Sequence, residues 1–143
     1  MVLIRKAKKS DLKIVSELFR TESAKKPYFQ EFNKKTAFEK ITEFFKEYDL
    51  YLAIDNKKII GFIALNINIK GKKAEVEELW LKPNYQGKGI GKSLMKFIED
   101  KCKEKGIKSI GLMANQNSKA LHFYKKLKYK VKHELLYMKK KIK

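Results

Sequence analysis

Residues 86–93 read Gln86-Gly87-Lys88-Gly89-Ile90-Gly91-Lys92-Ser93 and directly follow a stretch of strand-forming residues. The three glycines allow the backbone to turn tightly and to bring its N–H groups against an anion. The apolar spacing from Ile90 to Ile98 predicts a helix that begins within this run, and a helix N-terminus favours negative charge. The stretch therefore predicts a strand–loop–helix unit that binds a pyrophosphate, with Lys88 and Lys92 adding positive charge beside it.

Two other phosphate-binding motifs come close to this loop but do not fit it. The P-loop of nucleotide hydrolases needs glycine at position 86, where this chain has Gln86, and a metal-binding Asp on a later strand, whereas Asp55 comes earlier. The dinucleotide-binding pattern fails because the three glycines are spaced by twos. Neither a nucleotide hydrolase nor a dinucleotide-binding enzyme is therefore predicted.

Working outward from the loop, the sequence predicts a sheet flanked by helices. Upstream, strands are expected at Leu3-Ile4 and at residues 51–54, 58–65, 67–69 and 74–81, with tight turns at Asp55-Asn56 and Gly71-Lys72. Ser10-Asp11 is a candidate cap for a first helix, and aromatic residues from Phe38 to Phe45 are expected to face the core from a second. Together these patterns predict two hairpins beside a helical pair.

Downstream of the loop, the helix is expected to end near Gly106 and a strand to span residues 107–113. Asn117 or Ser118 can cap the next helix, and residues 129–138 are expected to complete the sheet as two strands, followed by a solvated tail from Lys139. The fold class predicted is α+β, a three-layer α/β/α arrangement. It has a mixed, mostly antiparallel sheet of six to seven strands and about four helices in a single domain, residues 1–143.

Composition supports one soluble domain. The chain has 143 residues, of which 43% are hydrophobic and 36% charged, so a single core can form. No stretch approaches the roughly 20 apolar residues of a membrane span, and the first ten residues lack a secretory pattern, so a cytoplasmic protein without membrane contact is expected. Cys102 is the only cysteine, and His122 and His133 are the only histidines, so no disulfide and no metal site is predicted.

The net charge of +19 is unevenly distributed. Residues 1–80 contain 17 Lys/Arg and 12 Asp/Glu, whereas residues 81–143 contain 18 and 4. A basic half attracts polyanions such as nucleic acid or a polyphosphorylated cofactor, although a lysine-rich composition can also arise without any such partner. Because no nucleic-acid-binding motif accompanies the charge, nucleic acid is expected only as a non-specific polyanion.

Three blocks of the sequence resemble the GCN5-related N-acetyltransferase (GNAT) family. The family's pyrophosphate loop, Q/R-x-x-G-x-G/A, is matched by Gln86, Gly89 and Gly91. A strand precedes that loop in the family, as residues 74–81 do here. Its downstream motif N-x-x-A-x-x-F-Y-x-x-x-G-F is matched by Asn117, Ala120, Phe123, Tyr124 and Tyr129, with one departure at Lys128, where glycine is usual. That departure concerns the geometry of the local turn.

The resemblance implies the acyl-CoA N-acyltransferase fold and acetyl-CoA as co-substrate, without a metal. The residues expected to hold acetyl-CoA are Leu79, Trp80 and Leu81, which pair with its pantetheine arm, the loop residues Gln86, Gly87, Lys88, Gly89, Ile90, Gly91, Lys92 and Ser93, and Asn117 and Tyr124. Tyr124 matches the family's donor to the departing thiolate. The resemblance also allows a homodimer, formed through the sheet edge or the C-terminal strands.

A general base is needed because an amine, with a pKa of about 10.4, is mostly protonated at neutral pH. The candidates are Glu75, Glu77 and Glu78 on the strand before the loop. The resemblance points to Glu77, with Glu78 or Glu75 as alternatives. Plain alternation places Glu75 and Glu77 on one face and Glu78 on the other, but a bulge, common in this strand in the family, would reverse that parity.

The expected activity is direct transfer of an acetyl group from the thioester to a primary amine: a polyamine, a small amine, a peptide N-terminus or a lysine. In the family, the first two helices and the loop between them recognise the acceptor, and here that region, residues 10–48, carries several glutamates. Two alternatives from other classes stay open. One is a basic nucleic-acid-binding module, and the other is an acetyl-CoA sensor that has lost turnover.

Overall fold

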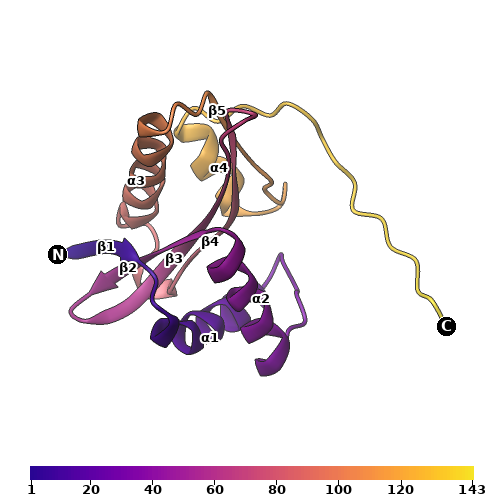
Figure 1. The fold of residues 1–143 in the computed structure, drawn as a ribbon. Coiled ribbons are helices and arrows are strands. Elements are labelled where there is room, and N and C mark those ends of the chain that lie inside the picture. The colour runs from indigo at the N-terminus through magenta and orange to yellow at the C-terminus, as the bar shows by residue number, and fades with distance from the viewer. The chain divides into compact units, whose positions relative to one another are not determined.

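Five strands form one sheet, in which neighbours follow the chain order β1-β2-β3-β4-β5 (Figure 1). The computed structural model describes residues 1–143, and these divide into two compact units, Met1–Met113 and Ala114–Lys143, each considered by itself below. The first unit contains β1 (Val2–Lys6), α1 (Leu12–Ser23), α2 (Lys34–Glu47), β2 (Asp49–Asp55), β3 (Lys58–Asn68), β4 (Lys73–Leu81), α3 (Ile90–Glu104) and β5 (Ser109–Leu112). The second contains α4 (Lys119–Lys126).

The pairing is antiparallel from β1 to β4 and parallel between β4 and β5, which confirms the mixed, mostly antiparallel sheet. The β2–β3 hairpin turns at Asn56 and Lys57, which adopt φ of 49° and 66°, rather than at Asp55-Asn56. The prediction of separate strands at residues 58–65 and 67–69 is wrong. They are one strand, β3, because the ladder with β4 continues through Leu65 and Asn66 to Asn68.

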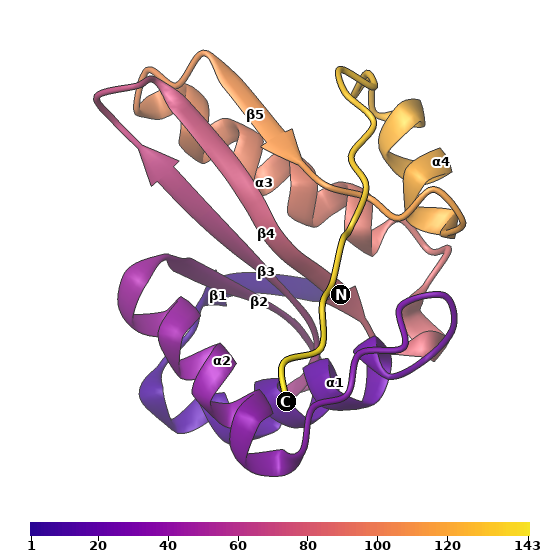
Figure 2. The ribbon, with the colours of Figure 1, turned by 90° about the vertical axis from the view of Figure 1, so that its right-hand side faces the viewer.

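Helices cover both faces of the sheet (Figures 1 and 2). Between the sheet and the α1–α2 pair lies a hydrophobic core that includes Val15 and Phe19 of α1, Ile41 of α2, and Phe62 and Ala64 of β3. On the opposite face, α3 buries one side that includes Leu94, Met95, Ile98 and Cys102. The Tyr51 and Phe97 rings meet edge to face at 5.0 Å between β2 and α3. The first unit is therefore layered, helix on sheet on helix.

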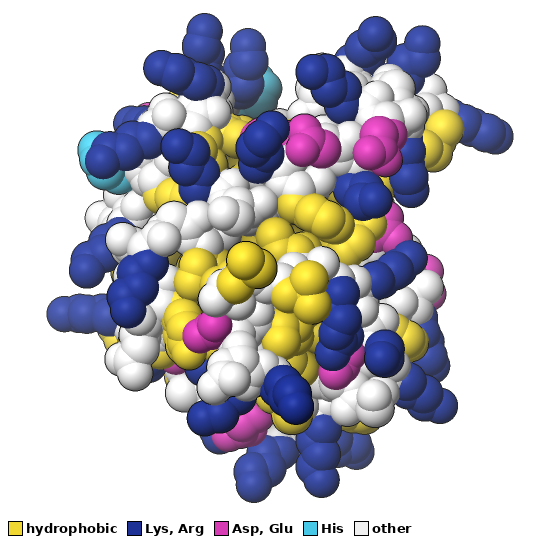
Figure 3. Space-filling model, turned by 90° about the vertical axis from the view of Figure 1, so that its left-hand side faces the viewer, with side chains coloured by type: hydrophobic (Ala, Val, Ile, Leu, Met, Phe, Trp, Pro, Cys, Tyr) yellow, Lys and Arg dark blue, Asp and Glu magenta, His cyan; other side chains and the backbone are white.

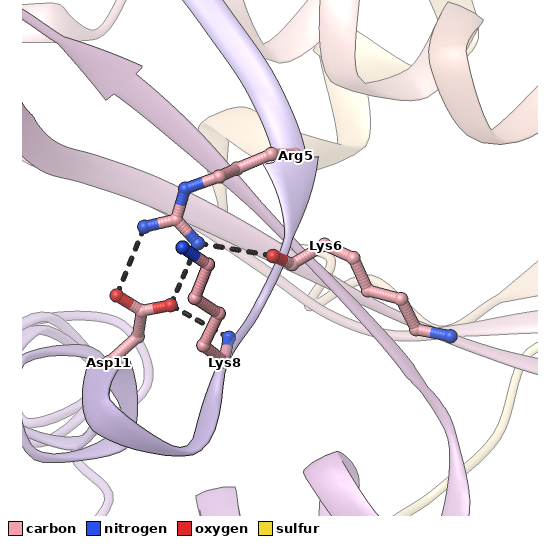
Figure 4. Close-up of polar contacts among 4 residues, drawn as sticks. All are labelled: Arg5, Lys6, Lys8 and Asp11. Carbon is pink, nitrogen blue, oxygen red and sulfur yellow. Dashed lines mark hydrogen bonds and ion pairs between the residues drawn. The ribbon is translucent and has the colours of Figure 1, made fainter.

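An ion pair joins the end of β1 to the start of α1 (Figure 4). The Arg5 guanidinium donates two hydrogen bonds to Asp11, at 2.8 and 3.0 Å, and the Lys8 N–H donates to the same carboxylate at 2.7 Å. These bonds, the Arg5 bond foremost, hold the pKa of Asp11 below its usual range. Asp11 is the N-cap residue of α1, as predicted from Ser10-Asp11, but its side chain serves Arg5 and Lys8 and makes no cap bond to the helix.

Two further expectations need correction. Phe38 does not face the core as expected, since it is 43% exposed, while Ile41 and Phe44 of the same helix are buried. Residues 129–138 form no strand and are exposed except for the partly buried Tyr129, so the sheet has five strands rather than six or seven. The alternating apolar residues in this segment predicted a strand, but a strand also needs a neighbouring strand to complete its backbone hydrogen bonds.

No helix is both long and apolar enough to cross a bilayer. On the face drawn in Figure 3, Lys and Arg side chains project from most of the surface, and Asp and Glu side chains are sparse. The net charge of +19 is thus displayed to solvent, where it raises the local concentration of anions.

The helices α3 and α4 end in the same way. Beyond α3, Gly106 N–H donates to the Lys103 carbonyl at 3.1 Å and Ile107 N–H to the Cys102 carbonyl at 3.0 Å. Beyond α4, Lys128 N–H donates to the Lys125 carbonyl and Tyr129 N–H to the Tyr124 carbonyl, both at 3.0 Å. Each is a Schellman motif, whose first residue past the cap is left-handed.

The residue in that left-handed position differs between the two helices. Gly106 and Lys128 both have φ of 74°, which costs a residue with a Cβ about 1–2 kcal/mol and costs glycine little. The turn expected from the family's glycine is therefore kept at Lys128, and the ring contact of Tyr124 with Tyr129, 5.9 Å between centroids, accompanies it.

Substituting Lys128→Gly is expected to stabilise α4 by about 0.5–1 kcal/mol, because glycine relieves the left-handed strain but adds some unfolded-state entropy. Denaturant unfolding and amide exchange in α4 measure the gain. The matched control is Gly106→Lys, expected to destabilise by about 1 kcal/mol through backbone strain, since no atom lies within 4 Å of its added Cβ. A destabilised Lys128→Gly protein would contradict the strain at this cap.

Candidate functional site

Strand β4 is paired on both sides for only half its length. Its first residues pair with β5 as far as Val76, which lies opposite Leu112, and residues 77–81 pair with β3 alone. Figure 2 shows β4 and β5 side by side at one end and diverging toward the other. The β5-facing edge of β4 therefore has no strand partner along residues 79–81, the residues predicted to pair with a pantetheine arm. Lys82 bonds to β3, so by alternation Trp80 does too, and the groups that face the open edge are those of Leu79 and the N–H of Leu81.

A β-bulge lies where the two strands part. Ala64 of β3 lies opposite Glu78, while the next residue, Leu65, lies opposite Val76, so Glu77 is the inserted residue. Directly paired side chains share a face, and Ala64 belongs to the core beneath α1 and α2. Glu78 therefore lies on the α1–α2 face: the bulge alternative is confirmed, and plain alternation does not hold here.

All three candidate carboxylates lie on this face of β4. Glu75 pairs with Asn66, two residues from Ala64, and Glu77 follows Glu75 by two. Glu77 is exposed. Glu75 lies against β5, because a Cβ on Gly111 would approach its Oε1 to 2.7 Å. The three glutamates therefore differ in surroundings rather than in face.

Glu78 has the most distinctive environment of the three. It is partly buried, and its Oε2 accepts a hydrogen bond of 2.7 Å from the indole N–H of Trp80. Burial raises the pKa of Glu78 to about 7, from an ordinary 4.5. The Trp80 hydrogen bond and the positive charge of Lys40 oppose that rise, while the negative charge of Glu77 adds to it. A carboxylate of this kind can take up and release a proton near neutral pH.

The loop after β4 is built from local hydrogen bonds and left-handed glycines. Lys82 N–H donates to the Ile60 carbonyl at 2.9 Å, and the Gln86 amide donates to the Leu81 carbonyl at 3.1 Å. Gly87 and Gly89 adopt φ of 74° and 84°, and nothing lies within 4 Å of where their Cβ atoms would be. The loop is thus open around both glycines, leaving room for a ligand to approach the backbone.

Gly89 is the N-cap of α3, and Ser93 N–H makes the helix's first intrahelical bond, 3.0 Å to the Gly89 carbonyl. The N–H groups of Ile90, Gly91 and Lys92 precede that bond and have no partner within the helix. Lys88 and Lys92 are exposed beside them. The predicted anion site therefore has its donors, its dipole and its positive charges in one place.

The remaining predicted residues lie in the second unit. Ser118, not Asn117, is the N-cap of α4, and Asn117 is exposed, with its N–H donating to the Asn115 side chain at 2.8 Å. Tyr124 is buried, and its ring contacts Phe123 at 5.0 Å. The roles of Asn117 and Tyr124 toward acetyl-CoA stay predictions.

Sequence reasoning missed the indole of Trp80 as a partner of Glu78, since Trp80 was expected only to offer its backbone. The sequence did contain a signal for this contact: Trp80 lies two residues after Glu78, and residues two apart share a face of a strand. It also missed Gly111, whose missing side chain leaves room for Glu75. Nothing in the sequence near residue 111 indicates that contact.

Comparison with known proteins gives the family. Residues 15–129 match the family model described as acetyltransferase (GNAT) family. This chain belongs to the GNAT acetyltransferases. The resemblance read from the loop and the downstream motif is thereby confirmed, and with it the acyltransferase fold and membership of a family of acetyl-CoA-dependent N-acetyltransferases.

Relatives of this GNAT chain include enzymes of several names. Spermidine N(1)-acetyltransferase of Thermoplasma acidophilum is 42% identical over 80 residues, 55% of this chain but only 48% of that enzyme. A solved PaiA N-acetyltransferase of the same organism, in complex with coenzyme A, is 30% identical with a TM-score of 0.68, covering 89% of this chain and 88% of that one. A possible acetyltransferase from Clostridium difficile 630 shares the fold, with a TM-score of 0.83 at 15% identity, covering 100% of this chain and 99% of that one.

The raised pKa of Glu78 predicts a pH-dependent cost to stability. The folded protein keeps a proton on Glu78 that the unfolded chain releases, so unfolding free energy falls as pH rises from about 4.5 to about 7. Glu78→Gln cannot ionise, so its free energy of unfolding does not fall in this way. Between pH 4 and pH 8, the free energy of unfolding of Glu78→Gln is expected to gain about 1–3 kcal/mol on that of the native protein. Denaturant unfolding at both pH values measures this.

The matched control is Glu77→Gln, which removes one exposed carboxylate from the same strand. It reports what the loss of a negative charge does without the burial. Each variant's free energy of unfolding is compared with that of the native protein at pH 4 and at pH 8. If both variants gain the same amount on the native protein between these pH values, the environment described for Glu78 is contradicted.

Proposed function

We propose that this chain transfers an acetyl group from acetyl-CoA to a primary amine, with Glu78 as the general base. The observation that carries the proposal is the partly buried Glu78 carboxylate, situated where β4 parts from β5. A base that works at neutral pH needs a pKa near the working pH, and that of Glu78 is about 7. The resemblance to the family points to Glu77, but the exposed position of Glu77 supports that role less well.

The residues present fit acetyl-CoA. The open edge of residues 79–81, with the backbone groups of Leu79 and the Leu81 N–H facing it, suits the amides of a pantetheine arm, in the manner of an added strand. The glycine loop, the start of α3 and the side chains of Lys88 and Lys92 suit a pyrophosphate. When bound, acetyl-CoA supplies an acetyl group activated as a thioester.

The proposed chemistry moves two protons off the nitrogen and one onto the sulfur. The Glu78 carboxylate removes the first proton from the protonated amine, directly or through a water, so that the nitrogen lone pair can form the new C–N bond, and the second proton leaves to solvent as the amide forms. The backbone N–H near Leu79 donates to the carbonyl oxygen as charge develops there. The C–S bond breaks, and we assign Tyr124 the role of donating a proton to the sulfur, on the strength of the family motif.

The acceptor is proposed to be a cationic amine. Glu75, Glu77 and Glu78 place three carboxylates along one face of β4, which attracts positively charged acceptors to an otherwise basic protein. The relative named spermidine N(1)-acetyltransferase supports an amine with further positive charges. A polyamine is accordingly the first acceptor to test, ahead of lysine, a peptide N-terminus or an aminoglycoside.

Calorimetric titration with acetyl-CoA, with ATP and a short RNA as controls at two salt concentrations, tests the co-substrate. One-to-one acetyl-CoA binding that persists at higher salt is expected, because backbone pairing contributes beside the charges. Binding of RNA alone, lost at higher salt, would favour the basic nucleic-acid module instead. Acetyl-CoA binding with no turnover on any amine would favour the sensor.

Steady-state kinetics of a matched pair then tests the base. Glu78→Gln is expected to lower kcat by about 10²–10⁴-fold and to abolish the lower limb of the pH–rate profile, while acetyl-CoA affinity changes little. Glu77→Gln is expected to change kcat only a few-fold. The reverse pattern would move the base to Glu77. Tyr124→Phe is expected to lower kcat toward the smaller end of that range, since a thiolate leaves readily.

An acceptor screen tests the amine class. Spermidine, a diamine, free lysine, a peptide with a free N-terminus and an aminoglycoside are compared by kcat/KM. The polyamine is expected to be preferred, and Glu77→Gln is expected to raise KM for it more than for a monoamine, because one carboxylate on the acceptor face is lost. Equal kcat/KM for all acceptors would contradict recognition through these charges.

A further inference from the structure

Trp80 is the group that touches Glu78 most closely. Its indole Nε1–H donates to Glu78 Oε2 at 2.7 Å, and no protein group donates to the other carboxylate oxygen, Oε1. The two residues are neighbours on one face because Glu78 lies opposite Ala64 and Trp80 opposite Phe62, beyond the bulge. The same insertion that turns Glu78 toward α1 and α2 therefore places its partner beside it.

The direction of the indole N–H is fixed by two other rings. Phe19 of α1 meets Trp80 with ring centroids 6.3 Å apart at 68°, and Tyr28 of the α1–α2 loop meets it at 4.8 Å and 76°. Both are edge-to-face contacts, the geometry that aromatic pairs prefer. Trp80 is partly buried against the core of this face. The indole therefore has a defined orientation from which to hold a carboxylate.

A hydrogen bond from a neutral donor to a carboxylate favours its ionised form. The charged groups that act on Glu78 besides Trp80 are Lys40 of α2, which also favours ionisation, and Glu77, which opposes it. Tyr28 is the ionisable residue that packs on the indole itself. Among these groups, only Trp80 fixes which carboxylate oxygen is occupied.

We propose that Trp80 is a positioning residue for acetyl transfer: its indole N–H holds Glu78 by Oε2 and leaves Oε1 directed to the proton of the amine. This inference rests on the proposed role of Glu78 as base. It assigns to the Trp80 side chain a part in the reaction separate from the backbone pairing expected of residues 79–81. Trp80 acts through Glu78 and does not itself exchange a proton.

Trp80→Phe removes the N–H and keeps a ring in the aromatic cluster. It is expected to lower kcat at pH 7 about 10-fold, the value of a hydrogen bond to a charged group, with little change in KM for acetyl-CoA. The lower limb of the pH–rate profile is expected to move to higher pH, because a carboxylate that loses a donor is protonated more easily. An unmoved limb with kcat unchanged would overturn the proposal.

Two controls separate positioning from loss of structure. Phe44→Leu disturbs the same core without removing the N–H or either ring that orients it, so it is expected to lower stability and leave the pH limb in place. Trp80→Phe added to Glu78→Gln is expected to cause no further loss of kcat, because Trp80 acts only through Glu78. A further loss as large as that in the native background would make Trp80 merely structural.

A readout without turnover keeps this inference distinct from the proposed function. Trp80 is the only tryptophan, so indole emission, excited where tyrosine does not absorb, reports on this residue alone. Emission is expected to titrate with a midpoint near 7 in the native protein and to lose that step in Glu78→Gln. If the emission titrates but no amine is acetylated, the proposed enzymatic function is wrong while the Trp80–Glu78 hydrogen bond is supported. Emission that does not change with pH would overturn the positioning role.

Discussion

Strand β4 can satisfy its backbone on both sides only as far as Val76, and the rest of the candidate site depends on that limit. Beyond it, β5 diverges and residues 79–81 pair with β3 alone, so the backbone groups of Leu79 and the N–H of Leu81 face an edge without a strand partner. An exposed strand edge is normally a liability that a protein covers. Here the glycine loop and the N-terminus of α3 follow directly after that open edge in the chain, so the proposed pantetheine and pyrophosphate sites adjoin one another.

The bulge determines the surroundings of Glu78. By inserting Glu77, it brings Glu78 onto the face covered by α1 and α2, where burial raises its pKa and the indole of Trp80 can reach it. Neither effect would arise for an exposed carboxylate in a fully paired strand. The aromatic contacts of Trp80 with Phe19 and Tyr28 then link this carboxylate to α1 and to the loop between α1 and α2.

Much of this arrangement could be predicted from the sequence, because it depends on local patterns. The loop at residues 86–93 and the helix ending near Gly106 follow from glycine positions and apolar spacing, and the β2–β3 hairpin follows from strand-forming residues on either side of a turn-forming Asp-Asn pair. The face of Glu78 could not be settled, because a bulge is a relation between two strands and alternation along one strand does not contain it. The prediction of strands at residues 129–138 is wrong for a related reason, because a strand forms only where a second strand is available to pair with it. Lys128 shows the opposite case. The hydrogen bonds of the turn hold it in a left-handed conformation that glycine adopts more easily.

The inserted residue in β4 also affects how relatives are compared. After Glu77, residue number and sheet face are out of step by one, so two homologous chains can place a glutamate in the same alignment column and direct it to opposite faces if only one of them carries the bulge. Conversely, glutamates in adjacent columns can occupy the same point in space. Equivalent carboxylates in this strand are therefore better identified by the residue that each faces on β3 than by their distance from the glycine loop.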